Sequence, residues 1–123
     1  MINNLKLGQL GEDIAKKYLK KRGYKILEQN YKNKYGEIDL VCRTGEIYES
    51  PLIVFVEVKT RMGELFGGPE GSLNRDKVRR LVKNAQAYMT RREPCPYRID
   101  AVCVVFDRDK KVKRIDHYQN ITG

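Results

Sequence analysis

The stretch Leu52-Ile-Val-Phe-Val-Glu-Val-Lys-Thr60 decides the fold. Its β-branched and aromatic residues favour a strand, and because apolar side chains occupy both faces, the strand is expected at the centre of a sheet. Its last residues change character. Glu57 and Lys59 share one face, and Val58 between them points to the other. The sequence therefore places a charged pair at the end of a buried strand.

Periodicity in the rest of the chain predicts two helices and four further strands. Residues 8–22 carry apolar side chains at helical spacing, and Gly23 ends that helix after a basic last turn. A second helix is expected over about residues 74–92, ended by Pro94 and Pro96. The further strands are expected at residues 24–31, 37–43, 98–106 and 112–118, which gives the order αβββαββ.

The connections between these elements predict how the strands pair. The first three strands follow one another through short links, which favours an antiparallel meander. The third and fourth strands are joined through the second helix, and such a crossover makes the two strands parallel. A chain of 123 residues suits one domain. We therefore expect a single α/β domain over residues 1–123, with a mixed central β-sheet and flanking helices.

The charge of the chain favours polyanionic partners. Lys and Arg total 25 against 16 Asp and Glu, a formal net charge of +9, and such a field attracts nucleic acid. Part of the excess lies on the second helix, whose basic face is either a solvated surface or a surface that contacts phosphates. The expected nucleic-acid contacts are Arg61, Arg75, Lys77, Arg79, Arg80 and Lys83. Tyr31, Tyr35 and Tyr48 could either stack on bases or pack between strands.

Cysteine usage and hydropathy indicate a cytoplasmic protein. Cys42, Cys95 and Cys103 form no Cys-x-x-Cys pair, so no structural zinc site is expected. Their odd number suits a reducing compartment, and His117 is expected to be structural or solvent-facing. The sequence has no apolar run of 18 residues, and its N-terminus lacks the apolar core of a signal peptide. We therefore expect a cytoplasmic protein with no membrane partner.

Acidic side chains on two neighbouring strands are expected to meet. Glu37 and Asp39 share a face of the second strand, and because the second and third strands form a hairpin, Asp39 is expected beside Glu57. Two adjacent carboxylates repel each other unless a cation neutralises them, and Mg²⁺ or Mn²⁺ takes oxygen ligands of this kind. Lys59 is well placed to orient or deprotonate a water, or to stabilise developing charge. This set of side chains suits cleavage of a phosphodiester bond.

Three motifs in the chain resemble one known superfamily. They are Gly8-x-x-Gly11-Glu12, Gly36-Glu37-Ile38-Asp39 and Phe55-Val-Glu57-Val-Lys59-Thr60-Arg61. Together they look like the PD-(D/E)xK restriction-endonuclease-like superfamily and, within it, like the YraN-type family of small bacterial proteins, over about residues 8–118. The layout is also similar to that of the archaeal Holliday-junction resolvases. The resemblance implies a restriction-endonuclease-like fold.

The resemblance also implies roles for individual residues. Asp39 and Glu57 would be metal ligands, the carbonyl of Val58 would be a further ligand, and Lys59 would be the catalytic lysine. Ile38 stands where the name of the superfamily has a proline. Because that proline carries no ligand, the departure leaves the implied site intact.

Two acidic residues and the second helix are open to more than one interpretation. Glu12 would be the helix carboxylate that completes or supports the site, or it would form an i,i+4 pair with Lys16. Glu37 is either a supporting group or a charge in the hairpin. Gln86 is followed at four-residue spacing by Thr90, so the related exonuclease branch with Gln-x-x-x-Tyr is not matched.

Three functions of different classes are consistent with these residues. The first is a Mg²⁺- or Mn²⁺-dependent nuclease that hydrolyses DNA phosphodiester bonds, structured or branched DNA included, and that could act as a homodimer to cut two strands. The second is a non-catalytic nucleic-acid-binding module with the same fold. The third is a protein–protein adaptor that uses the loop at residues 62–72.

Overall fold

The elements follow one another in the order expected from the sequence. The computed structural model describes residues 4–45, 50–63 and 74–122, so Tyr48 and most of the loop at residues 62–72 lie outside the described part. The elements are α1 (Asn4–Lys21), β1 (Lys25–Asn33), β2 (Gly36–Thr44), β3 (Leu52–Met62), α2 (Arg75–Met89), β4 (Tyr97–Phe106) and β5 (Val112–Tyr118).

The boundaries of the two helices differ from the prediction. α1 begins at Asn4, a turn before the expected start at Gly8, because the helix tolerates Gly8 in its interior as it does Gly11. α2 ends at Met89 rather than Arg92. There the backbone N–H groups of Arg91 and Arg92 donate to carbonyls three residues back, so the chain tightens into a turn. Neither shift moves a candidate site residue out of its element.

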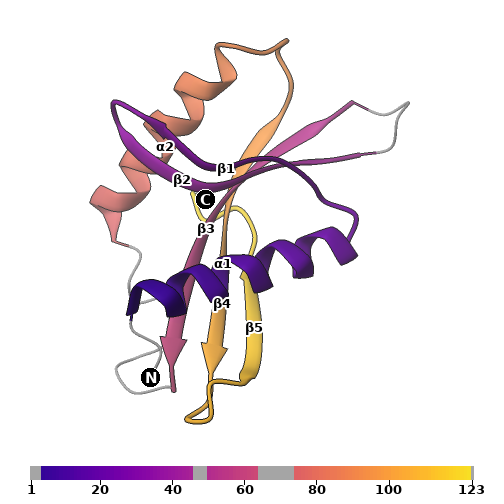
Figure 1. Cartoon of the computed structure of the whole chain (residues 1–123). Coiled ribbons are helices and arrows are strands. Elements are labelled where there is room, and N and C mark those ends of the chain that lie inside the picture. Colours follow the sequence, from indigo (N-terminus) through magenta and orange to yellow (C-terminus); the bar gives the residue numbers. More distant parts are fainter. Residues whose placement is uncertain (1–3, 46–49, 64–73, 123) are drawn as a thin grey trace.

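The five strands form one mixed sheet in the order β1-β2-β3-β4-β5 (Figure 1). β1, β2 and β3 pair as an antiparallel meander, β3 and β4 are parallel, and β4 and β5 are antiparallel. The predicted meander, the crossover and the central position of β3 are therefore confirmed. Among the described helices, none is long and apolar enough to cross a membrane.

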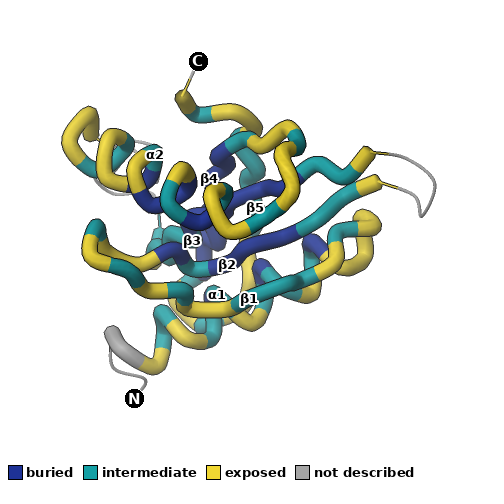
Figure 2. The backbone as a smooth tube through the Cα atoms, turned by 90° about the horizontal axis from the view of Figure 1, so that it is seen from above, coloured by how far each residue is buried: buried dark blue, intermediate teal, exposed yellow. Residues whose placement is uncertain are grey.

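One helix covers each face of the sheet. Leu19 and Ala15 of α1 pack with one set of strand side chains, and Leu81, Ala85 and Tyr88 of α2 pack with the other. Figure 2 shows the buried stretches in the middle strands and on the sides of the helices that face them. This burial on both faces explains why β3 is apolar on both faces and holds the two helices in fixed positions over the sheet.

Gly11 sets how closely α1 approaches the sheet. A Cβ atom built at Gly11 would collide with the side chain of Thr60 on β3, whereas one built at Gly8 meets nothing within 4 Å. The absence of a side chain at Gly11 thus lets the helix lie directly against β3. Because Glu12 is the next residue, this close approach brings its carboxylate towards the part of β3 that carries Glu57.

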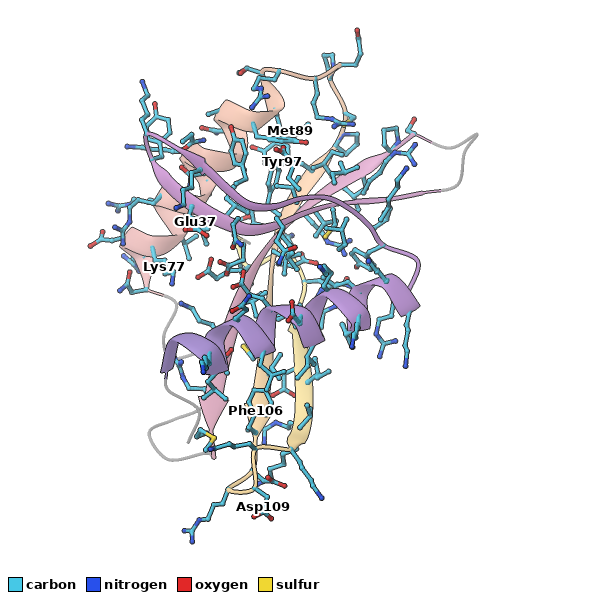
Figure 3. The ribbon with its side chains drawn as sticks, viewed as in Figure 1. Glu37, Lys77, Met89, Tyr97, Phe106 and Asp109 are labelled. Atoms are coloured by element: carbon cyan, nitrogen blue, oxygen red, sulfur yellow. The ribbon has the colours of Figure 1, made fainter. Side chains whose placement is uncertain are left out.

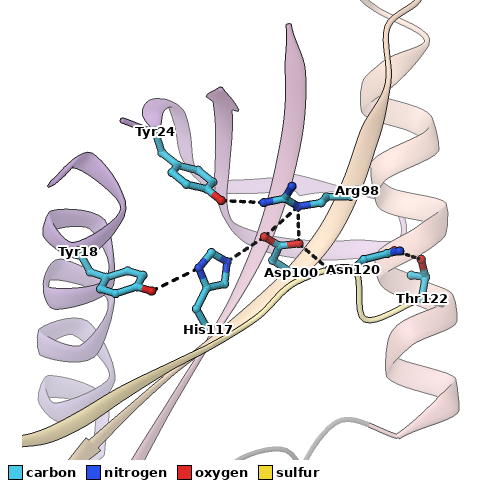
Figure 4. A network of polar contacts seen from close by, with 7 residues as sticks. All are labelled: Tyr18, Tyr24, Arg98, Asp100, His117, Asn120 and Thr122. Carbon is cyan, nitrogen blue, oxygen red and sulfur yellow. Dashed lines mark hydrogen bonds and ion pairs between the residues drawn. The ribbon is translucent and has the colours of Figure 1, made fainter. Parts of the chain in front are cut away.

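A polar network connects β4 and β5 to the segment between α1 and β1 (Figure 4). Asp100 is fully buried, and its carboxylate lies 2.9 Å from both Arg98 Nε and His117 Nε2 and also accepts from the backbone N–H of Asn120. Arg98 in turn donates to the Tyr24 hydroxyl over 2.7 Å. Burial raises the pKa of Asp100, but the hydrogen bonds from His117 and Arg98 outweigh it and lower the pKa overall. The structural interpretation of His117 is therefore confirmed.

The contact between Gly11 and Thr60 can be tested with two matched substitutions. Gly11→Ala should lower the free energy of unfolding by about 1–3 kcal/mol, because the added methyl group forces the helix or Thr60 to shift. Gly8→Ala should raise it by up to about 1 kcal/mol, since alanine favours the helix and the site is open. Urea unfolding followed by circular dichroism measures both. Thr60→Ala should restore part of the loss in the Gly11→Ala background, and equal effects at the two glycines would contradict the close approach.

Candidate active site

β2 and β3 part at the two acidic residues. Their pairing runs from Thr44 opposite Leu52 to Leu40 opposite Val56, whereas β2 stays paired with β1 as far as Gly36. One residue beyond Leu40, the backbone N–H of Val58 donates to Oδ2 of Asp39 over 2.7 Å. A carboxylate thus takes the place of a strand partner. We call this place, where β2 and β3 separate beyond Leu40 and Val56, the fork.

The Glu57 carboxylate lies inside the fork and contacts two ammonium groups. Glu57 is only 6% exposed, and its Oε1 lies 3.1 Å from Lys59 Nζ and 2.8 Å from Lys77 Nζ. Lys59 is two residues further along the same face of β3, as predicted. Lys77 comes from the first turn of α2, whose N-cap Asn74 accepts from the Lys77 N–H. The ion pair therefore joins α2 to the middle of β3.

The acidic and basic groups of the fork shift one another's pKa values. Burial and then the charge of Glu57 raise the pKa of Asp39 to about 7, although the hydrogen bond from Val58 opposes the shift. Burial lowers the pKa of Lys59, and its contact with Lys77 adds to the effect. For Lys77, burial lowers the pKa, but the hydrogen bonds with Glu57 and Lys59 and the charges of Glu57 and Asp39 together outweigh burial and raise the pKa. Such mutually perturbed groups are typical of functional sites.

Glu12 reaches the same place from α1. Burial, followed by the charges of Glu37, Asp13 and Glu57, raises the pKa of Glu12. The amide nitrogen of Asn30, oriented so that it donates, lies 2.9 Å from Oε1 of Glu12 and 3.0 Å from Oε1 of Glu37. Asn30 therefore links the two acids and connects α1 to β1 and β2.

The i,i+4 alternative for Glu12 finds no support in the contacts of its expected partner. Lys16 Nζ donates to Oε1 of Gln29 on β1 over 3.2 Å. Lys16 thus fastens α1 to β1, while Glu12 is directed to the acidic residues of the fork. Of its two interpretations, the geometry favours the one in which Glu12 supports the site.

Asp39 lines two pockets. The first, of about 320 Å³, is lined by residues of β2, β3 and α2, among them Glu37, Glu57 and Lys77. Figure 3 shows Glu37 and Lys77 on the same side of the molecule, where β2 and α2 approach each other. The second, of about 500 Å³, lies between α1 and β3, and its lining includes Glu12 and Val58. The fork can therefore be approached from both faces of the sheet.

The chain is similar to proteins of one family. Residues 11–104 match the Uncharacterised protein family UPF0102. The chain belongs to this family. A UPF0102 protein of Clostridium kluyveri is 40% identical over 114 residues, which cover 91% of this chain and 89% of the relative. Another, of Alkaliphilus metalliredigens, is 40% identical over 116 residues, which cover 93% and 94%.

The similarity extends over nearly the whole chain. A UPF0102 protein of Caldanaerobacter subterraneus is 40% identical over 122 residues, 97% of this chain and 96% of the relative. UPF0102 is the YraN-type family, so the resemblance stated from the three motifs is confirmed, and the observed topology agrees with a restriction-endonuclease-like fold.

The six expected nucleic-acid contacts of this UPF0102 chain are placed in three different ways. Lys77 lies in the first pocket on Glu57 rather than on the outer surface of α2. Arg80 also lines the first pocket and Arg61 lines the second, where its guanidinium donates to the Thr60 carbonyl over 2.9 Å. Arg75, Arg79 and Lys83 line neither pocket, and all three are exposed, as Arg80 is too. Arg79 lies 3.9 Å from Asp76.

The two tyrosines that the structure describes, Tyr31 and Tyr35, differ in their surroundings. Tyr31 packs edge-on against Tyr88 with a centroid distance of 5.2 Å, so it belongs to the core under α2. Tyr35 lines the first pocket. Tyr35 therefore stays a candidate for contact with a ligand.

Two asparagines of the site have no place in the sequence prediction. Asn30 adopts a left-handed φ of 53°, which asparagine tolerates better than most residues. Asn84 lies on the buried side of α2, between Leu81 and Tyr88, and is 1% exposed. A polar residue within the predicted apolar stripe was the signal for Asn84, whereas the role of Asn30 depends on how closely α1 approaches β1.

The pKa of Asp39 predicts a dependence of stability on pH. Between its ordinary value of 3.8 and about 7, the folded chain retains a proton that the unfolded chain has released, so this group makes the fold less stable as pH rises through that range. Asp39→Asn removes the effect. The variant should exceed the parent in free energy of unfolding at pH 8 by on the order of 1–3 kcal/mol, and the difference should shrink towards pH 4.

Urea unfolding in the presence of EDTA at several pH values measures this difference. Asp109→Asn, at an exposed position in the turn between β4 and β5, provides the matched control and should show no such change with pH. A gain for Asp39→Asn that is the same at pH 4 and pH 8 would contradict the raised pKa.

Proposed function

We propose that this protein is a nuclease that hydrolyses phosphodiester bonds of DNA, with Mg²⁺ or Mn²⁺ as its cofactor. One observation carries the proposal: Asp39, Glu57 and Lys59 meet at the fork between β2 and β3. Hydrolysis of a phosphodiester requires an attacking water and stabilisation of charge on the phosphate. Two carboxylates and a lysine at one point supply groups for both tasks.

The donor set fits a hard divalent cation. Within residues 4–45, 50–63 and 74–122, no three His, Cys, Asp or Glu side chains form a ready-made metal cluster. Mg²⁺ needs only one or two carboxylates, since it keeps several of its waters. Asp39 and Glu57 would hold the ion. The Val58 carbonyl would add an oxygen, because the N–H and C=O of a strand residue face the same neighbour and this N–H faces Asp39.

The chain's own residues would divide the remaining work. When bound, the cation lowers the pKa of an attached water and stabilises negative charge on the phosphate. Lys59, with its lowered pKa, would accept a proton from the attacking water or stabilise the developing charge. Glu12 would hold this arrangement in place through Asn30 and Glu37.

The basic surface would bind the DNA backbone. Arg75, Arg79 and Lys83 are exposed on α2, and Arg61 and Arg80 line the two pockets beside Asp39. With a net charge of +9, the chain would attract DNA and hold it across the fork. The proposal includes structured or branched DNA as a substrate, a homodimer as the active form and the cytoplasm as the location. Within the described part of the chain, Cys42, Cys95 and Cys103 form no disulfide bond, which suits a reducing compartment.

A second candidate function is a nucleic-acid-binding module without turnover. The observation in its favour is that Lys59 and Lys77 both contact Glu57. The chain thus neutralises this carboxylate with its own cations, and a protein that never binds a metal ion would be expected to do so.

A cleavage assay separates the two functions. Branched, single-stranded and duplex DNA is incubated with the protein in Mn²⁺ or in EDTA, and products are resolved on a denaturing gel. Cleavage should require Mn²⁺ and should fall by at least about 100-fold in Asp39→Ala and in Lys59→Ala, because each removes a group needed in the transition state. Asp109→Ala and Lys17→Ala, at exposed positions away from the fork, should cleave like the parent.

The other outcomes of the assay contradict the site or one of the functions. Metal-dependent cleavage that survives in both Asp39→Ala and Lys59→Ala would exclude the fork as the active site. If there is no cleavage but DNA binds with a slope of log K against log salt near about −4 to −5, as expected for roughly five neutralised phosphates, the binding module is supported. A slope near zero would contradict both functions and favour the protein–protein adaptor.

A further inference from the structure

The first pocket contains a buried polar atom that the proposed hydrolysis does not use. The side chain of Asn84 is 1% exposed, and its Oδ1 has no hydrogen-bond partner within the part of the chain that the structure describes. The same residue lines the pocket beside Asp39 and Glu57. A buried acceptor without a partner is unfavourable, and natural proteins rarely keep one without a reason. An N–H group of a ligand in the pocket would satisfy it.

The position of Asn84 is fixed by the turn between β1 and β2. Asn33 Nδ2 donates to the backbone carbonyl of Asn84 over 3.4 Å, and Asn33 Oδ1 accepts from the backbone N–H of Tyr35 over 2.9 Å. Gly36 has a φ of 129°, and a Cβ there would lie 3.6 Å from Asn84 Nδ2. These contacts hold Tyr35 and Asn84 in the wall of one pocket.

The wall of the pocket carries groups that suit the phosphate and the base of a nucleotide. Arg80 supplies a guanidinium that pairs with phosphate, Tyr35 supplies an aromatic ring on which a base can stack, and Asn84 Oδ1 accepts from an N–H of a base edge. A volume of about 320 Å³ is of the size that small-molecule sites have. In a duplex the pairing N–H groups of a base are already bonded, so an unpaired base suits Asn84 best.

We propose that this pocket takes one unpaired nucleotide of a DNA strand, with the base against Tyr35 and its N–H donated to Asn84 Oδ1. The inference rests on the proposed function for its choice of DNA, since the pocket opens beside the carboxylates of the fork. It goes further in assigning the substrate class: DNA with an unpaired nucleotide next to the bond that is cut. Through this hydrogen bond, Asn84 distinguishes a nucleotide that carries a base from one that lacks it.

Binding without a metal ion tests the pocket separately from cleavage. A duplex with one unpaired adenine and the same duplex with an abasic residue at that position are titrated in EDTA at fixed salt, with fluorescence anisotropy as the readout. The duplex with the base should bind about tenfold more tightly, because the backbone charge is the same and only the base differs. Equal affinities for the two duplexes would overturn the proposal.

A substitution of similar size identifies the atom involved. Asn84→Leu removes the polar atoms, so it should reduce the preference for the base to less than about twofold and leave the midpoint of urea unfolding equal or higher. Gln86→Leu, at an exposed position on α2, is the control and should keep the preference. A full preference in Asn84→Leu would overturn the role of Asn84. If that variant does not fold, the comparison of the two duplexes with the parent protein still tests whether the pocket binds a base.

The failure of this inference and the failure of the proposed function give different results. DNA cleavage that needs Asp39 but shows equal binding of the duplexes with and without the base would overturn the nucleotide pocket and leave the nuclease intact. A preference for the unpaired base that is lost in Asn84→Leu, in a protein that cleaves no DNA, would establish the pocket and exclude the nuclease.

Discussion

Two carboxylates held side by side away from water repel each other, and each loses part of its hydration. Asp39 and Glu57 are in this position, and much of the surrounding structure compensates for it. The Val58 N–H donates to Asp39, and Lys59 and Lys77 contact Glu57. The pKa of Asp39 near 7 shows that the compensation is incomplete, because the site still favours a proton at mildly acidic pH. Under the proposed function, a divalent cation would complete the compensation that Lys59 and Lys77 begin.

The fork between β2 and β3 makes this arrangement geometrically feasible. A fully paired hairpin would use the Val58 N–H within the ladder and would leave the carboxylates on one face of the sheet. Because the pairing stops at Leu40 and Val56, Asp39 borders pockets on both faces. Each helix then contributes to the site from its own side: α1 through Glu12, which the contact of Gly11 with Thr60 brings close, and α2 through Lys77.

Most of the fold and the centre of the site could be predicted from the sequence. Strand alternation placed Glu57 and Lys59 on one face, and the hairpin placed Asp39 beside Glu57, because both relations depend only on local geometry. The fork, the link from Glu12 through Asn30 and the unpartnered oxygen of Asn84 could not be predicted. They depend on distances between elements remote in sequence, as does the contact that draws Lys77 from the expected DNA surface to Glu57.

The position of both carboxylates on one hairpin has a consequence for the order of folding. β2 and β3 are joined by a short connection, so the entropy lost on closing it is small, whereas β4 reaches β3 only after the whole of α2 has been crossed. Pairings between remote segments limit the folding rate of such topologies. The acidic hairpin therefore tends to form before Lys77 arrives with α2 to neutralise it. When α2 packs on the sheet, it brings Lys77 to Glu57, so burial of the helix and neutralisation of this carboxylate occur together.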